Sequence, residues 1–250
     1  MPTRVRLNKF LRDCNLGSRR KCERLIEQGL VEINDEVVTQ IGTLVDLEKD
    51  VVKVRGIAVR PETDRIYVVA YKPRGAVVTL TDPHGRPTIF DVVKDLPQGI
   101  FPVGRLDKES EGLILLTNDG KLAHRLTHPR YSIERVYLVE VEGQVSQETI
   151  EKLMSGVVID SGLARAKHAK MVAKPGGHSM LKITLTEGKK REIRRMLQVC
   201  GYSVVMLKRI RFGCVTIGDL SPGQWRHLTR DELRGLRRLV EEAYLAKKER

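Results

Sequence analysis

The residues with the greatest potential for chemistry lie in a polar stretch, Gly-Arg-Leu-Asp-Lys-Glu-Ser-Glu-Gly-Leu, at residues 104–113. A strand-like segment precedes it, and the apolar run 113–116 ends it. This pattern predicts a loop held between two buried strands, a common location for catalytic groups. Asp107, the aspartate at its centre, is a candidate for carboxylate catalysis. An aspartate in a loop is more often a helix cap or a surface ion-pair partner, so spacing alone makes it only a candidate.

A second stretch, Glu-Gly-Lys-Lys-Arg-Glu-Ile-Arg-Arg-Met at residues 187–196, is strongly basic. The pattern predicts that a strand ends at Gly188 and that a helix follows, with Ile193, Met196 and Leu197 on its apolar side. Positive side chains at a helix start add to the positive end of the helix dipole, which is unfavourable for stability but favourable for binding phosphates. The alternative is a solvated helix start without a ligand.

The third candidate is Tyr137, at the start of a predicted strand over 137–141. Aromatic residues favour strands, so a core position is the more frequent explanation for a tyrosine here. Its alternative role is stacking on a nucleic-acid base.

Charge indicates the class of partner. The chain of 250 residues has a net charge of +13. Residues 1–30 carry eight Lys or Arg against three acids, and residues 181–211 carry nine against two. Such clustering predicts a face for RNA or DNA rather than general solubility. The alternative is a basic protein without a polyanionic partner.

Other classes find no support in the sequence. It has no Walker loop, no Gly-x-Gly-x-x-Gly, no His-Glu-x-x-His and no paired Cys-x-x-Cys. We therefore expect no nucleotide cofactor, no metal and no other cofactor. The chain has no long apolar run and no signal-peptide pattern at residues 1–10, which predicts a cytoplasmic protein without a membrane span.

The pattern of elements predicts two domains of an α+β protein, at residues 1–60 and 61–250, joined by a linker near 55–64. In the first, two short helices meet at Gly17 and Ser18, and tight β structure follows. The second mixes mainly antiparallel strands with helices, and Thr229 with Glu232 predicts a capping box that opens the last helix. The outer surface of the second short helix is basic. Its charged residues are Arg19, Arg20, Lys21 and Arg24.

The motif at residues 104–129, which begins Gly-Arg-Leu-Asp and ends Leu-Thr-His-Pro, is similar to the signature of the RsuA-like family of ribosomal RNA pseudouridine synthases. Other family motifs follow in the same order at residues 70–75, 135–143, 185–197, 206–213 and 220–229. Residues 5–56 resemble the small S-four type RNA-binding domain that usually precedes the catalytic domain. The resemblance covers nearly the whole chain. Two positions depart from the commonest motifs, because Arg135 stands where Lys is frequent and Glu192 where Gln is frequent.

The resemblance implies isomerisation of a uridine in ribosomal RNA, with Asp107 as the essential aspartate. Tyr137 would stack on the flipped base, and Arg194 would pair with the catalytic carboxylate. The form of the basic helix start slightly favours large-subunit RNA, and a monomer is the expected state. Phosphate contacts are expected from two groups of residues. They are Arg19, Arg20, Lys21 and Arg24 in the first domain, and Arg105, Lys189, Lys190, Arg191 and Arg195 in the second.

Two other functions would use the same charge pattern. A non-catalytic RNA-binding factor for ribosome assembly would have no use for an acid in a phosphate-binding pocket, where the acid repels the ligand. A nuclease would need the clustered acids that hold metal ions, and the sequence lacks them.

Overall fold

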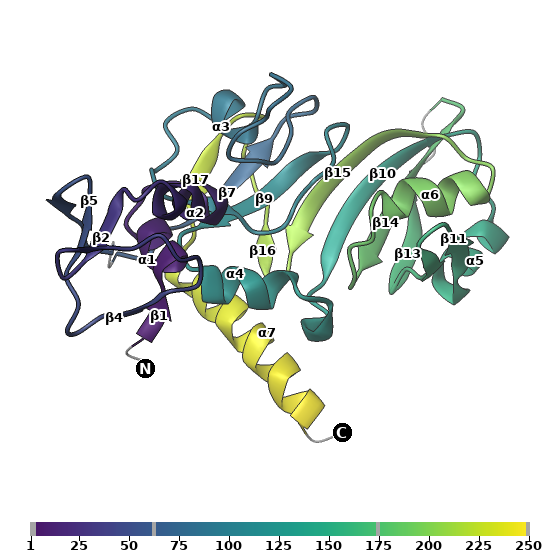
Figure 1. Ribbon diagram of the computed structural model, residues 1–250. Coiled ribbons are helices and arrows are strands. Elements are labelled where there is room, and N and C mark those ends of the chain that lie inside the picture. Colours follow the sequence, from purple (N-terminus) through teal and green to yellow (C-terminus); the bar gives the residue numbers. More distant parts are fainter. Residues whose placement is uncertain (1–3, 62–63, 174–175, 249–250) are drawn as a thin grey trace. The chain divides into compact units, whose positions relative to one another are not determined.

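A computed structural model of the chain describes residues 4–61, 64–173 and 176–248. The chain forms two compact units (Figure 1). The first contains Met1–Ile66 with Pro97–Phe101, and the second contains Tyr67–Leu96 with Pro102–Arg250. In the described part of the chain, no helix combines the length and the apolarity needed to cross a membrane.

The first unit is built on two short helices and two small sheets. Its helices are α1 (Leu7–Asp13) and α2 (Arg19–Glu27). The Ser18 hydroxyl accepts a hydrogen bond from the Lys21 backbone N–H at 3.2 Å, which confirms the cap expected at the start of α2. Its strands are β1 (Arg4–Arg6), β2 (Val31–Ile33), β3 (Glu36–Val37), β4 (Leu44–Asp46), β5 (Val52–Val54) and β6 (Ile57–Ala58).

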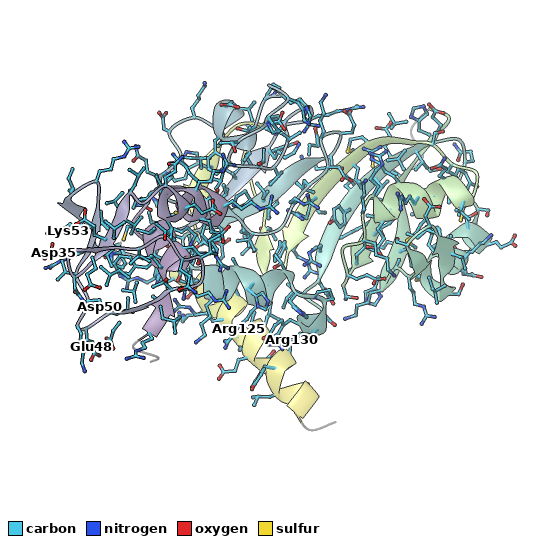
Figure 2. All side chains as sticks on the ribbon, in the orientation of Figure 1. Asp35, Glu48, Asp50, Lys53, Arg125 and Arg130 are labelled. Atoms are coloured by element: carbon cyan, nitrogen blue, oxygen red, sulfur yellow. The ribbon has the colours of Figure 1, made fainter. Side chains whose placement is uncertain are left out.

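The strands of this unit are all antiparallel, with β1 paired to β4 and the others in the order β3-β2-β5-β6. The inner faces of the helices and strands share one apolar core. Lys53 on β5 forms an ion pair with Asp35 in the turn between β2 and β3 (Figure 2). The core residues are Leu7, Phe10, Leu11, Cys22, Ile26, Val31, Val45, Val52 and Val54.

The second unit is organised around a nine-stranded sheet whose main path is β13-β14-β10-β15-β9-β7-β17. The curved β10 and β15 run alongside each other in Figure 1. Adjacent strands with a described register pair antiparallel, except β9 and β15, which pair parallel at two positions. The strands of this sheet are β7 (Tyr67–Lys72), β8 (Phe101–Pro102, whose first residue is counted with the first unit), β9 (Glu111–Thr117), β10 (Arg135–Glu142), β13 (His168–Ala173), β14 (His178–Leu185), β15 (Val204–Phe212), β16 (Val215–Thr216) and β17 (Trp225–His227). This confirms the mainly antiparallel α+β fold.

Helices and a small hairpin complete the second unit, and α6 packs against the hairpin while α5 packs against β13. Thr229 and Glu232 exchange backbone and side-chain hydrogen bonds, which confirms the capping box of the last helix. The helices are α3 (Ile89–Val92), α4 (Gly120–Thr127), the 3-10 turn η1 (Pro129–Tyr131), α5 (Gln147–Ser155), α6 (Glu192–Val199) and α7 (Arg230–Lys248), and the hairpin is β11 (Val157–Ile159) with β12 (Gly162–Ala164).

The helix expected after Gly188 begins only at Glu192. Arg191 adopts a left-handed backbone conformation, with φ of 55°, that ends the preceding turn. The Glu192 side chain then accepts a hydrogen bond from the Lys189 backbone N–H at 3.0 Å. The basic residues 189–191 therefore form a turn before the helix rather than its first turn.

Candidate active site

Asp107 lies in a tight turn that leads into β9. Its carbonyl oxygen accepts a hydrogen bond from the Ser110 N–H at 3.0 Å, and the Lys108 carbonyl accepts one from the Gly75 N–H at 2.8 Å. The Asp107 side chain is half-buried. Its carboxylate forms no hydrogen bond or ion pair with another residue among those the structure describes. Backbone hydrogen bonds therefore fix the turn that carries Asp107, and its carboxylate is available to contact a ligand.

Lys72, at the end of β7, forms hydrogen bonds with the backbone of this turn. Its side chain is fully buried. The ammonium donates to the carbonyl oxygens of Pro73 at 2.8 Å, Ser110 at 2.7 Å and Lys108 at 3.3 Å. Burial lowers the pKa of Lys72 to about 8, although the negative charges of nearby acids, Asp107 among them, act in the opposite direction. A buried cation thus fixes the backbone on both sides of Glu109, two residues beyond Asp107.

Tyr137 lies on β10, in a row of residues across the middle of the sheet. Its backbone pairs with Ile183 of β14 on one side and Arg209 of β15 on the other. Arg209 pairs in turn with Gly112 of β9. The tyrosine is 9% exposed. The row therefore joins the tyrosine to the strand that follows the Asp107 turn.

A cleft of about 750 Å³ brings these residues to one place. Asp107, Leu106 and Arg105 line it from the turn, Tyr137 lines it from the sheet, and the basic turn 189–191 also contributes to its lining. A cleft of this volume is within the range that takes a small ligand or one nucleotide. Its combination of a carboxylate, an aromatic ring and basic side chains suits a nucleotide whose base stacks and whose phosphates stay near the cations.

Comparison with known proteins identifies the family. Residues 66–199 match the family model described as RNA pseudouridylate synthase, and residues 5–52 match the S4 domain. The chain belongs to the RNA pseudouridylate synthase family. As a pseudouridine synthase it is an isomerase that acts on RNA, which confirms the resemblance found in the sequence motifs.

Similar proteins support this assignment over the full length. A protein of Aquifex aeolicus named as an uncharacterized RNA pseudouridine synthase is 43% identical, over 98% of this chain and 99% of its own length. The ribosomal large subunit pseudouridine synthase B of Bacillus subtilis is 37% identical, over 94% of this chain and 97% of its own. A crystal structure of a pseudouridylate synthase with 29% identity superposes with a TM-score of 0.65, covering 93% of this chain and 99% of that one.

The position of Arg194 in this synthase differs from the expected ion pair with Asp107. Its guanidinium donates instead to the carbonyl oxygens of Glu109 at 2.9 Å and Val204 at 3.0 Å. Burial is the main cause that lowers the pKa of Arg194, and the Asp107 charge opposes that shift. Arg194 therefore contacts the backbone of the Asp107 turn rather than its carboxylate.

The basic residues expected to bind RNA occupy different environments. Arg105, Lys190 and Arg191 are exposed at the cleft, whereas the Lys189 ammonium contacts Glu187 and the Leu163 carbonyl. Arg195 is not in the lining of the cleft and lies 3.5 Å from Asp160 in an ion pair. In the first unit, all four basic residues of α2 are exposed. They are Arg19, Arg20, Lys21 and Arg24, and Arg19 also donates to the Asn8 side chain.

Sequence reasoning missed several buried polar residues near the cleft. Glu192 is 3% exposed, and burial raises the pKa of its carboxyl to about 7. Lys72, Arg135 and Arg209 are also buried. Lys72 and Arg135 each stand beside a run of strand-forming apolar residues, which was their only signal in the sequence. Glu192 and Arg209 lie among other charged residues, a pattern that usually means an exposed face. Among the residues described, no group of three or more His, Cys, Asp or Glu lies close enough to hold a metal ion.

Proposed function

We propose that this pseudouridine synthase isomerises one uridine of ribosomal RNA, with the RNA of the large subunit as the substrate and Asp107 as the essential carboxylate. The main support is the half-buried Asp107, which lines the same cleft as Tyr137. Relatives in Bacillus subtilis and Pseudomonas aeruginosa, 37% and 39% identical, are both named for the large ribosomal subunit. The protein acts in the cytoplasm, as a monomer, and without a metal or a nucleotide cofactor.

The reaction breaks the bond from C1′ of the ribose to N1 of uracil, turns the base and joins C1′ to C5. C5 then loses its proton and N1 gains one, so the change is a net isomerisation. Asp107 would serve it by attacking C1′, by stabilising a cationic sugar, or by removing a proton from the neighbouring sugar carbon. Each role needs a carboxylate that no other residue engages, and the Asp107 carboxylate has no hydrogen-bond or ion-pair partner among the described residues.

The target base must leave the RNA helix before it can react, at a cost of a few kcal/mol. Stacking on Tyr137 would recover about 1–3 kcal/mol of that cost. Arg105, Lys190 and Arg191 at the cleft would hold the phosphates on either side of the flipped nucleotide. These contacts fix the position of the strand and carry little sequence information.

Arg194 acts in this proposal as a positioning residue. Its hydrogen bond to the Glu109 carbonyl holds the turn that carries Asp107. Lys189 and Arg195 add positive charge near the turn, although both have partners within the protein.

The two-domain division also belongs to the proposal. Residues 1–60 form the RNA-binding domain, which contacts RNA through Arg19, Arg20, Lys21 and Arg24, and residues 61–250 form the catalytic domain. The separate family matches at residues 5–52 and 66–199 support this division. Two weak RNA contacts on linked domains raise the overall affinity by effective concentration.

The test is to map pseudouridine in ribosomal RNA, by carbodiimide modification and primer extension, in cells that lack the protein. We expect one large-subunit stop to disappear on deletion and to return with the wild-type protein but not with Asp107→Asn. Asp219→Asn, at an exposed turn residue, is the matched control and should restore the stop. An unchanged pattern of stops on deletion would contradict the proposal and favour an assembly role or another RNA.

A further inference from the structure

One buried cation in the lining of the cleft has an unused hydrogen-bond donor. Arg209 on β15 is 2% exposed, and its Nε donates to the Leu113 carbonyl at 2.7 Å. Its Nη2 is buried and has no hydrogen-bond partner among the described residues. A buried donor without an acceptor destabilises the folded protein, and more so when it is charged, so a site that keeps one needs a reason.

The neighbouring arginine shows that the fold can satisfy such a group. Arg135 on β10 is also buried and also lines the cleft. Its Nη1 and Nη2 donate to the carbonyl oxygens of Glu187 and Leu126 at 3.3 and 3.2 Å. Both arginines lie over the ring of Phe212, at 5.1 and 5.4 Å from its centroid. The free donor therefore belongs to Arg209 in particular and not to every buried arginine of this sheet.

The position of Arg209 connects it to the proposed base-binding residue. It pairs directly with Tyr137 across β10 and β15, and with Gly112 across β15 and β9. A base stacked on Tyr137 would therefore bring its edge toward the strand that carries Arg209. The phosphates of the same nucleotide would contact the exposed cations at the rim of the cleft. The RNA backbone stays solvated there and does not reach the buried guanidinium of Arg209.

We propose that Arg209 donates a hydrogen bond to a carbonyl oxygen of the flipped uracil and stabilises the negative charge that develops on the base. The inference rests on the proposed function and adds a residue to it. When the bond between C1′ and N1 breaks, its electron pair leaves with N1 and spreads over the two carbonyl oxygens O2 and O4. A fixed cation at one of these oxygens stabilises the detached base more strongly than the neutral substrate, which is how an active site lowers a barrier.

The symmetry of uracil makes one donor sufficient for the whole reaction. To present C5 in place of N1, the detached base turns about the axis through N3 and C6. That turn exchanges the positions of O2 and O4. A donor placed at either position therefore meets a carbonyl oxygen before and after the rotation, and Arg209 has no need to move.

The test compares the full-length wild-type protein with Arg209→Gln and Arg209→Lys. Single-turnover rates and dissociation constants are measured with an RNA substrate that contains uridine or 5-fluorouridine at the target position. Arg211→Gln removes the same charge from a half-buried, ion-paired position on the same strand, outside the lining of the cleft, and is the control. Thermal melting checks that each variant is folded.

We expect Arg209→Gln to slow the reaction of uridine by about 10²–10³-fold, as loss of one donor to a developing anion does, with the dissociation constant changed by less than about threefold. Fluorine withdraws charge from the base and makes it a better leaving group. Cleavage of 5-fluorouridine should therefore slow about tenfold less than that of uridine, a difference that a merely structural role would not produce.

Equal slowing of both substrates, or a rate equal to that of Arg211→Gln, would overturn the inference while leaving the proposed function intact. If Arg209→Gln does not fold, Arg209→Lys is measured in its place, because lysine keeps the charge but misplaces the donor. Greater slowing of uridine than of 5-fluorouridine in that variant would support the inference, and equal slowing would overturn it. A wild-type protein that converts no uridine in ribosomal RNA would overturn the proposed function and this inference with it.

Discussion

The Lys72 ammonium lies 2.7 Å from the carbonyl oxygen of Ser110, three residues beyond Asp107 in the same turn. Lys72→Met fills the space but leaves three carbonyl oxygens without their donor. We expect it to lower the free energy of unfolding by about 1–3 kcal/mol and to slow single-turnover catalysis more than RNA binding. Urea unfolding and rate measurements on the same samples check this. Lys170→Met, at an exposed position on β13, should change neither.

Glu192 gives a prediction for the dependence of stability on pH. Its pKa is raised from 4.5 to about 7 by burial, so the folded protein favours the neutral form. The stabilisation that neutral Glu192 contributes to the folded protein is complete below pH 4.5, its ordinary pKa. It is lost as the pH rises through about 7. Glu192→Gln keeps the shape and cannot ionise, so we expect it to gain about 1–3 kcal/mol over the wild type between about pH 5 and pH 8.

Urea unfolding of both proteins across this pH range measures that difference. Glu241→Gln, at an exposed position on α7, should follow the wild-type curve. A difference between Glu192→Gln and the wild type that stays constant over the range would show that Glu192 is ionised throughout.

Gly112 on β9 pairs with Arg209 on β15 and leaves no room for a side chain. An added Cβ would lie 2.3 Å from the Arg209 carbonyl oxygen, and the glycine has φ of 100°. Both the contact and the backbone conformation oppose a side chain, so we expect Gly112→Ala to cost more than about 3 kcal/mol of stability. Gly143→Ala, with φ of 82° and no atom within 4 Å, carries only the conformational cost of about 1–2 kcal/mol. Equal melting temperatures for the two variants would contradict this account.

The exposed cations of α2 give a prediction for RNA binding. Removing one cation that binds a phosphate reduces the slope of log affinity against log salt by about 0.7–0.9. Arg20→Ala with Arg24→Ala should therefore weaken binding and reduce that slope by about 1.4–1.8, without changing the rate at saturating enzyme. The double variant Arg234→Ala with Arg238→Ala removes two ion-paired arginines from α7 and should leave the slope unchanged. Salt titrations by filter binding distinguish the two.

The sequence predicted the elements that depend on local signals. The caps at Ser18 and Thr229 and the Gly-flanked turn around Asp107 all follow from residues close together in the chain. Distant partners were not predictable in this way. Lys72 is bound by the carbonyl of a residue 38 positions away, and Arg209 by one 96 positions away. Each stands in a strand sequence that gives no sign of where its acceptor lies.

The start of α6 shows a second limit. A run of basic residues after a glycine predicts a helix start that would bind phosphate, but the left-handed Arg191 and the cap by Glu192 delay the helix. Arg194 then faces the Glu109 carbonyl instead of the Asp107 carboxylate. The choice between a carbonyl and a carboxylate two residues apart depends on side-chain placement, which sequence similarity does not determine.

The order of strands has a consequence for synthesis of the chain. β15 lies between β10 and β9, although it is made after both of them and after β14. Until residues 204–212 leave the ribosome, the nascent sheet has a gap at its centre, and β9 and β10 each present an unpaired edge. Open edges of this kind invite pairing with other chains. A ribosome that stalls before residue 204 would therefore release an aggregation-prone fragment. That fragment would lack β15, which lines one side of the cleft.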